Sequence, residues 1–367
     1  MRLYMYALVA AAVILLQGCG SDTEGSFVST TERSVAPYSD NPLYYQQWYL
    51  HRDDAFYATY GIDPDANIHP WPTTQYTGRG VKVVVIDDAL DTYHEDLKDG
   101  IVATYDVESR TSDVLPRSSI ENHGTEVTGV VLATSNTLGI TGIAPGAQIY
   151  FIRIPFTSAL TESMIIDAFQ QAKEWGADVI NCSWGSGDVS AAVAAAIQDV
   201  AVNGRGGKGT IVVFAAGNGG DDALGDPIGN DESGLPEVIA VGATNIYNQR
   251  TPYSNYGPEL DLMAPGGEYM GIATLDRTGS VGDDPGNYLY FNSPGAFGGT
   301  SASAPIVAGA AALLLEANGD LTREEVMSLL QSHADKIDTA QCSYDTNGHS
   351  DYCGYGKINL YNTLLAL

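Results

Sequence analysis

The chain has 367 residues, of which 44% are hydrophobic, so it is long enough for one large domain or two ordinary ones. Its 17 Lys and Arg residues stand against 45 Asp and Glu residues, which gives a formal net charge of -28. Such a chain lacks the basic face that phosphate groups require, so nucleic acid is excluded as an expected partner. This excess of negative charge is typical of the solvated surface of an exported protein. The alternatives are recruitment of divalent cations or basic peptides, and adaptation to salty surroundings.

The N-terminus reads MRLYMYALVAAAVILLQGCGSD. One Arg followed by an apolar stretch that ends near Leu16 is the layout of a secretory signal, and the stretch is short for a membrane span. The segment LQGC at 16–19 resembles the bacterial lipobox, which implies that Cys19 is the lipidated first residue of the mature protein. The alternative is an ordinary signal peptide with a chance Cys. We expect a signal peptide over 1–18 and an exported lipoprotein, anchored to a bacterial membrane on its periplasmic or cell-surface side.

Residues 19–40 are expected to form a flexible tether, because the segment after Cys19 is rich in Ser, Thr, Glu and Asp and has no hydrophobic periodicity. Beyond it, short apolar runs without alternation are typical of parallel strands that are covered on both faces. Six such strands are predicted, at residues 81–87, 101–107, 147–154, 177–184, 209–216 and 237–244.

Three helices are predicted between and after these strands, at residues 161–176, 190–204 and 303–319. The last is apolar on nearly every side and should run through the core. The alternation predicts one domain over 41–367, with a doubly wound, mostly parallel sheet and helices on both faces.

Three cysteines remain after Cys19. Export makes a disulfide plausible, and the loop QCSYDTNGHSDYC is expected to be closed by Cys342 and Cys353. Cys182 lies in an apolar strand and is expected to be a buried free thiol. Zinc is not expected, because no second Cys or His pair stands at metal-ligand spacing.

Polar residues follow several predicted strands, at the edge where open parallel sheets place their functional groups. VVVIDD ends on Asp87 and Asp88, His123 opens the helix of NHGTEVTG, Asn218 follows a strand in AAGNGG, and Ser301 begins the helix of GTSASAP. A serine hydroxyl needs an adjacent base to act as a nucleophile, imidazole is such a base, and a carboxylate orients the imidazole. Each residue alone is a weak signal, since a strand-end Asp usually caps a helix. Their joint occurrence indicates acyl transfer.

These motifs resemble those of the subtilisin-like serine proteases, whose known order is Asp, His, Ser. VVVIDD resembles the family's Asp block, NHGTEVTG its His block and GTSASAP its Ser block, within a match from about 41 to 360. The resemblance implies that Asp87 orients His123, that His123 takes the proton of Ser301, and that Asn218 is the oxyanion-hole side chain. INCSWG and AAGN resemble the strands that line the family's substrate cleft. The substrate-binding residues implied there are Ser183, Trp184, Gly185, Ala216 and Gly217.

A finer resemblance is to the kexin and proprotein-convertase branch, through NP to QQWYL at 41–50, Asp87-Asp88, CSWG and GTSASAP. That branch prefers Arg or Lys before the cut. The resemblance implies that Asp188 is an acid of the pocket for that residue and that Asp88 points outward to a residue further back, with Glu121 near another acidic position.

Several residues depart from the convertase pattern. Ala89 replaces the Gly after the two acids, and Asn255 stands where the convertases have a Glu ligand of a calcium ion. Of the acids that follow Asn218, none aligns cleanly with the expected pocket acid: Asp221, Asp222, Asp226 and Asp231. Broad subtilisin-type specificity is one alternative, and Asp188 as an acid that caps the following helix is another.

Calcium is the cofactor that the resemblance implies. Asp96 matches a subtilisin-family calcium ligand, and TSNTLGITGIAP resembles the partner loop. The expected ligands are the Asp96 carboxylate, the Asn136 side-chain oxygen, the carbonyls of Thr134, Leu138 and Ile140, and Asn41 or, alternatively, Asp40. An oxygen shell of this kind suits Ca²⁺. The alternative is that Asp96 is a surface acid.

The expected partner is a peptide or protein substrate. Because the segment between Cys19 and Asn41 is short for the family's folding pro-domain, we expect that the enzyme folds unaided or with a separate chaperone or inhibitor chain, and that it is a monomer. A competing hypothesis is a lipoprotein of this fold that binds peptides without cutting them.

Overall fold

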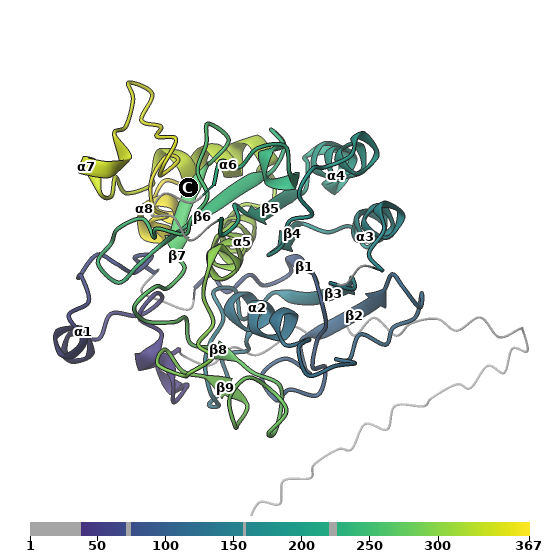
Figure 1. Ribbon diagram of the computed structural model, residues 1–367, viewed down its shortest axis with the longest axis horizontal. Helices are drawn as coiled ribbons and strands as arrows, with labels where there is room; N and C mark the ends of the chain where they lie inside the picture. Colours follow the sequence, from purple (N-terminus) through teal and green to yellow (C-terminus); the bar gives the residue numbers. More distant parts are fainter. Residues whose placement is uncertain (1–37, 71–74, 157–158, 220–225) are drawn as a thin grey trace, which may run out of the picture. The chain divides into compact units, whose positions relative to one another are not determined.

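A computed structural model of the chain describes residues 38–70, 75–156, 159–219 and 226–367 (Figure 1). The expected signal peptide, Cys19, most of the expected tether, and Asp221 and Asp222 lie outside the described residues.

The described chain is built around a seven-stranded sheet in the order β2-β3-β1-β4-β5-β6-β7, and every pairing in it is parallel. The strands are β1 Lys82–Asp87, β2 Ile101–Asp106, β3 Gln148–Arg153, β4 Val179–Cys182, β5 Ile211–Ala215, β6 Ile239–Thr244 and β7 Leu262–Pro265. The six predicted strands are confirmed. The seventh, β7, was missed because it is short and contains a proline, which argues against a strand except at a sheet edge. β7 is an edge strand.

Both faces of the sheet are covered, as predicted. In β1, Val83 and Val85 belong to one apolar core, whereas Val84 and Ile86 belong to the other. Helices α2 (His123–Leu132) and α5 (Thr300–Ala317) contribute to the first core, and α3 (Glu162–Glu174) and α4 (Ala191–Asn203) to the second (Figure 1). The predicted fold class is therefore confirmed.

The remaining elements are short or peripheral. The helices are α1 (Asp54–Tyr60), α6 (Arg323–Ser332), α7 (Thr339–Cys342) and α8 (Leu360–Leu365), and the 3-10 turns include η4 (Glu232–Gly234). Strands β8 (Thr274–Leu275) and β9 (Tyr288–Leu289) form a small antiparallel pair.

Helix α5 begins three residues earlier than predicted, so Ser301 lies inside its first turn. Within the described residues, α5 has the length and composition of a membrane span, but 83% of that stretch is buried inside the protein. It is therefore the core helix that the apolar pattern predicted.

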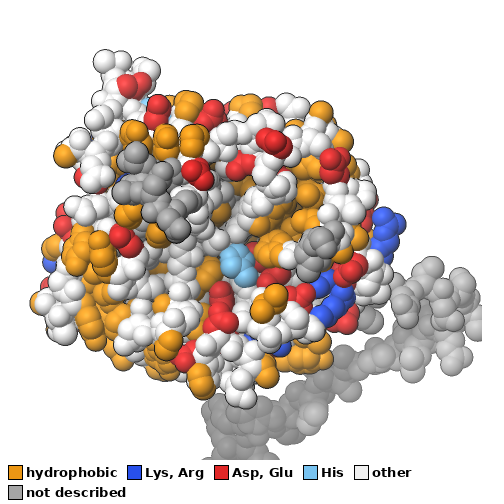
Figure 2. All heavy atoms as spheres, viewed as in Figure 1, with side chains coloured by type: hydrophobic (Ala, Val, Ile, Leu, Met, Phe, Trp, Pro, Cys, Tyr) orange, Lys and Arg blue, Asp and Glu red, His pale blue; other side chains and the backbone are white. Residues whose placement is uncertain are grey.

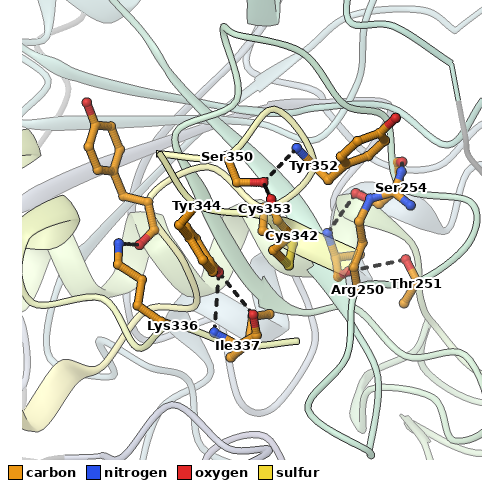
Figure 3. Close-up of a disulfide and its surroundings, with 12 residues drawn as sticks. Arg250, Thr251, Ser254, Lys336, Ile337, Cys342, Tyr344, Ser350, Tyr352 and Cys353 are labelled. Atoms are coloured by element: carbon orange, nitrogen blue, oxygen red, sulfur yellow. Dashed lines mark hydrogen bonds between the residues drawn. A yellow bond between two sulfur atoms is a disulfide. The ribbon is translucent and has the colours of Figure 1, made fainter. Parts of the chain in front are cut away.

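Both cysteine predictions are confirmed. Cys342 and Cys353 form a disulfide with a Cα–Cα distance of 5.5 Å, and Cys182 is a buried free thiol (Figure 3). The disulfide closes the loop after α7, beside the segment that contains Arg250 and Ser254.

Candidate active site

The predicted polar residues come from the carboxyl ends of the central strands and from the first turns of two helices. Asp87 ends β1, Ser183 directly follows β4, and Asn218 follows β5. His123 opens α2 and Ser301 lies in the first turn of α5. Because β1, β4 and β5 are neighbours in a parallel sheet, these residues gather at one edge. Figure 2 shows many more acidic than basic side chains on the visible face of the molecule, in keeping with the net charge of -28.

Asp87 and His123 form a hydrogen-bonded pair. The His123 Nδ1–H donates to Asp87 Oδ1 at 2.8 Å, and the Asp87 carboxylate is fully buried. Gly124 makes this approach possible, since a Cβ there would lie 2.3 Å from the Ala89 carbonyl oxygen and 3.1 Å from the Asp87 Cβ. The close packing of α2 on the end of β1 therefore requires glycine at 124.

The charges around His123 favour its protonated form. Burial alone would lower the pKa of the imidazole, but the charge and hydrogen bond of Asp87, with the charges of Asp88 and Glu126, raise it to about 9.

Two aromatic rings that no sequence pattern indicated lie near the imidazole: Phe156 at 6.1 Å and Phe297 at 5.6 Å between ring centroids. The His123 side chain remains 28% exposed beside these rings.

Ser301 and Ser183 hold each other through reciprocal hydrogen bonds. The Ser301 hydroxyl donates to the Ser183 carbonyl at 3.1 Å, and the Ser183 hydroxyl donates to the Ser301 carbonyl at 2.9 Å. Among the described hydrogen bonds none joins Ser301 to His123, and the Ser301 hydroxyl donates to Ser183 instead. Hydrogen bonds between catalytic groups are often formed only when substrate is bound.

The orientation of the Asn218 amide is determined by Thr300. Asn218 Oδ1 accepts the Thr300 backbone N–H at 2.8 Å and its hydroxyl at 3.0 Å. A backbone N–H can only donate, so the amide oxygen must face Thr300. The Nδ2 group of this exposed residue is therefore left as a donor beside the first turn of α5.

Asp88 does not point outward, and that prediction was wrong. It is 3% exposed, and its Oδ1 accepts the backbone N–H of Gly124 at 2.7 Å and of Ala89 at 2.6 Å. The N–H groups at the start of a helix have no partner inside it, and a carboxylate satisfies them well. Burial and the charge of Asp87 raise the pKa of Asp88 to about 7. Asp88 is thus placed to support α2 and has no free face for a substrate.

The segment after β4, residues 183–188, differs in two ways from the substrate-binding segment that the sequence predicted. The Trp184 side chain is in the core, where it packs on Phe214 and its indole N–H donates to the Ile86 carbonyl at 2.8 Å, so only its backbone can line a cleft. Asp188 is exposed, and Ser190 rather than Asp188 caps α4 by accepting the Val193 N–H. The alternative of a capping acid was therefore wrong.

The other predicted substrate-binding positions differ in exposure. Gly185 is exposed, Ala216 is buried, and Gly217 is partly buried with a φ of 98°. Glu121 is held by Arg153, whose Nη2 donates to it at 2.6 Å.

Two adjacent acidic residues, Asp231 and Glu232, lie beside the segment Gly185–Ser186. Glu232 is fully buried, and its carboxylate accepts the Ser186 N–H at 3.0 Å and the Ser186 hydroxyl. Asp231 caps η4 through Oδ1, whereas its Oδ2 would lie 3.8 Å from a Cβ placed on Gly185. Spacing alone could not align Asp231 with a pocket acid, because its neighbour Gly185 is distant in sequence.

The predicted calcium ligands Asp96 and Asn136 are in direct contact. Asp96 is fully buried, so the alternative of a surface acid was wrong. Its Oδ1 accepts the Asn136 Nδ2 at 2.7 Å, and its Oδ2 is buried without a hydrogen-bond partner among the described residues. Burial raises the pKa of Asp96, although the hydrogen bond from Asn136 opposes the increase. A buried carboxylate oxygen of this kind fits a bound cation.

The rest of the predicted shell is neutral. Asn41 is buried, and its Oδ1 accepts the N–H of Asn136 at 3.1 Å. Asn136 Oδ1 accepts the Leu138 N–H at 2.7 Å, and the Thr134 N–H donates to the Asp96 carbonyl at 2.9 Å. Ile140 is buried. Within the described ranges, no cluster of three or more His, Cys, Asp or Glu side chains could hold a metal, so a cation here would depend on carbonyl and amide oxygens.

Comparison with known proteins agrees with this geometry. A model described as the subtilase family matches residues 78–356. A calcium-dependent protease of Trichormus variabilis is 35% identical over 356 residues, which cover 89% of this chain and 52% of that protein. A subtilisin of Bacillus pumilus is 36% identical over 286 residues, which cover 78% of this chain and 91% of the subtilisin.

A solved structure is also similar. The serine protease of Aeromonas sobria, in complex with a chaperone, has a TM-score of 0.77 and 25% identity, covering 92% of this chain and 68% of that one. The chain spans about half the length of the calcium-dependent proteases that it matches. These relatives are bacterial and support the family without supporting the kexin branch. On the family match and these identities, the chain belongs to the subtilase family.

Proposed function

We propose that the chain is a serine endopeptidase that hydrolyses peptide bonds with Asp87, His123, Ser301 and Asn218. The observation that carries the proposal is the 2.8 Å hydrogen bond from His123 Nδ1 to the buried Asp87. This bond requires the proton on Nδ1, which leaves Nε2 as the acceptor that a general base needs.

In the proposed mechanism, the Ser301 Oγ attacks the carbonyl carbon of the substrate while His123 Nε2 accepts the hydroxyl proton. Asp87 stabilises the imidazolium that forms. The oxygen of the tetrahedral intermediate is negatively charged, and it accepts hydrogen bonds from Asn218 Nδ2 and from the Ser301 N–H, in the first turn of α5. His123 then returns the proton to the leaving amine. Water then attacks the acyl-enzyme while His123 accepts its proton, and His123 returns that proton to the Ser301 Oγ as the bond between Oγ and the acyl carbon breaks and the acid product leaves.

A fluorophosphonate probe tests this proposal, because it reacts only with an activated serine. We expect labelling of the wild-type protein and none of Ser301→Ala. Labelling of both to the same low extent would favour the competing hypothesis, a protein of this fold that binds peptides without cutting them.

We also propose a preference for Arg or Lys before the cut, because Asp188 is exposed and Asp231 faces Gly185. A peptide library scanned at the position before the cut measures it. Enrichment of basic residues that declines in Asp188→Asn or Asp231→Asn would support the proposal. A flat profile would instead indicate broad subtilisin-type specificity.

Calcium is the cofactor that we propose. Asp96, Asn136 and Asn41, with the carbonyls of Thr134, Leu138 and Ile140, would hold it, and the ion would stabilise this loop without taking part in the reaction. The supporting observation is the buried Asp96 Oδ2, which has no hydrogen-bond partner in the part of the chain that the structure describes. A calcium-dependent protease among the relatives agrees with the proposal.

We further propose that the protein is exported and anchored through lipidated Cys19, that it acts as a monomer, and that a separate chain assists its folding. The lipobox-like segment at 16–19 supports the anchor, and the Aeromonas sobria protease solved with a chaperone supports the assistance. Metabolic labelling with a radioactive fatty acid, compared between wild type and Cys19→Ala, would test the anchor.

A further inference from the structure

We propose that Asn255 is a positioning residue that holds the backbone of the turn Gly217–Gly219, so that the Asn218 amide, which Thr300 orients, lies where it can receive the substrate oxyanion. This inference rests on the proposed peptidase function. It gives Asn255 a role that requires no metal, at the position where the convertases have a calcium ligand.

Asn255 binds the turn on both sides of Asn218. Its backbone N–H donates to the Gly217 carbonyl at 3.0 Å, and its Oδ1 accepts the Gly219 N–H at 2.7 Å. The neighbouring Ser254 forms a β-bridge with Asn218 itself. One residue therefore fixes the backbone before and after the proposed oxyanion donor.

The same Oδ1 also accepts a second backbone N–H, from a residue beyond the turn. It accepts the Asp226 N–H at 3.1 Å in addition to that of Gly219. Two backbone donors are thus satisfied by a single side-chain oxygen. Removing this oxygen leaves two N–H groups without this acceptor and frees the turn.

The side chain also packs tightly on the turn. A Cβ on Gly217 would lie 2.4 Å from Asn255 Nδ2, and a Cβ on Gly219 would lie 2.5 Å from Asn255 Oδ1. Glycine at both positions lets the amide of Asn255 reach the backbone. The Gly217 φ of 98° also favours glycine there.

The residues on either side of Asn255 in sequence contact Arg250 and the disulfide-bonded loop 342–353. The Tyr256 and Tyr352 rings stack at 4.9 Å, and the Arg250 guanidinium lies 5.9 Å and 5.5 Å from their centroids. The Arg250 Nη2 group donates to the Ser254 carbonyl, and the Gly257 N–H donates to the Asp351 carbonyl at 2.7 Å. The neighbours of Asn255 in sequence are thus held by these contacts, and Asn255 itself binds the turn Gly217–Gly219.

The test is a double-mutant cycle between Asn255→Ala and Asn218→Ala, measured as kcat and KM on one peptide substrate. Loss of an oxyanion donor costs about 10²–10³ in kcat, so we expect Asn218→Ala to show that loss. We expect Asn255→Ala to lower kcat at least tenfold with little change in KM. In the double variant we expect no further loss beyond Asn218→Ala, because the two residues act as one unit. Asn203→Ala, an exposed Asn on α4, is the matched control and should retain wild-type kcat.

Asn255→Asp keeps an acceptor oxygen and should retain more kcat than Asn255→Ala, even if the alanine variant folds poorly. Additive losses in the cycle, a rise in KM at unchanged kcat, or an aspartate variant as impaired as alanine would each overturn the inference. Failure of the proposed function would be distinct, since Ser301→Ala would then hydrolyse the peptide as fast as wild type.

Discussion

At the scale of single residues, the role of a buried carboxylate depends on which N–H groups lie next to it. Asp87 and Asp88 are adjacent in VVVIDD and are both buried, yet Asp87 accepts a hydrogen bond from the His123 imidazole and Asp88 accepts one from the Gly124 backbone N–H. The sequence indicates that an acid ends this strand. It does not indicate which way the second acid turns, because Gly124 comes from another element.

Asp88 also affects the ionisation of His123, which gives a prediction about pH. His123 must be neutral to accept the serine proton, and its pKa is about 9, so kcat/KM should rise with pH through the alkaline range. The pKa of Asp88 is about 7, so this residue is charged in that range and favours the imidazolium. Asp88→Asn removes the charge and should move the acid limb of the kcat/KM profile to lower pH, by up to about one unit. A limb that stays in place or moves to higher pH would contradict the assignment.

At the scale of elements, the contact between β1 and α2 brings the proposed acid and base together. The contact depends on Gly124, because the first turn of α2 lies against the Ala89 carbonyl. An apolar run without alternation predicted the strand, and the motif NHGTEVTG predicted that His123 opens a helix. The contact of Gly124 with the Ala89 carbonyl became visible only in the packed structure.

Gly124→Ala should therefore damage both stability and catalysis. The added Cβ would lie 2.3 Å from the Ala89 oxygen and 2.8 Å from the Phe151 ring, so α2 must shift. We expect a loss of about 1–3 kcal/mol in unfolding free energy. We also expect a fall in kcat of about a hundredfold, since small misplacements of reacting groups have large effects. Gly319→Ala, whose Cβ would make ordinary contact at 3.6 Å, is the control for thermal unfolding and peptide hydrolysis.

At the scale of the whole molecule, the chain has a large excess of negative charge and a buried carboxylate oxygen at Asp96 with no partner among the described residues. Net charge far from zero destabilises a compact state through repulsion between like charges. A bound cation would reduce this repulsion locally and would stabilise the folded state by mass action.

Calcium removal should therefore lower Tm. At a hundredfold excess over Kd, a ligand that binds only the folded state contributes about 2.7 kcal/mol, which corresponds to a shift of several degrees for a domain of this size. In calcium, Asp96→Asn should have a lower Tm than the wild-type protein, and chelation should no longer change that Tm. Differential scanning calorimetry measures the Tm of both proteins in calcium, in a chelator, and in magnesium as the control cation. A wild-type Tm that is the same in all three solutions would count against the site.

The sequence by itself determined the fold class, six of the seven sheet strands, the disulfide and the residue types of the proposed active site, because buried apolar runs and short motifs are local properties of the chain. Only the tertiary structure decided the inward turn of Asp88, the core position of Trp184, the direction of the Asn218 amide and the edge strand β7. Each of these depends on a hydrogen-bond or packing partner that is distant in sequence, such as Thr300 for Asn218. The orientation of a polar side chain is determined by the donors and acceptors around it, and folding alone brings them together.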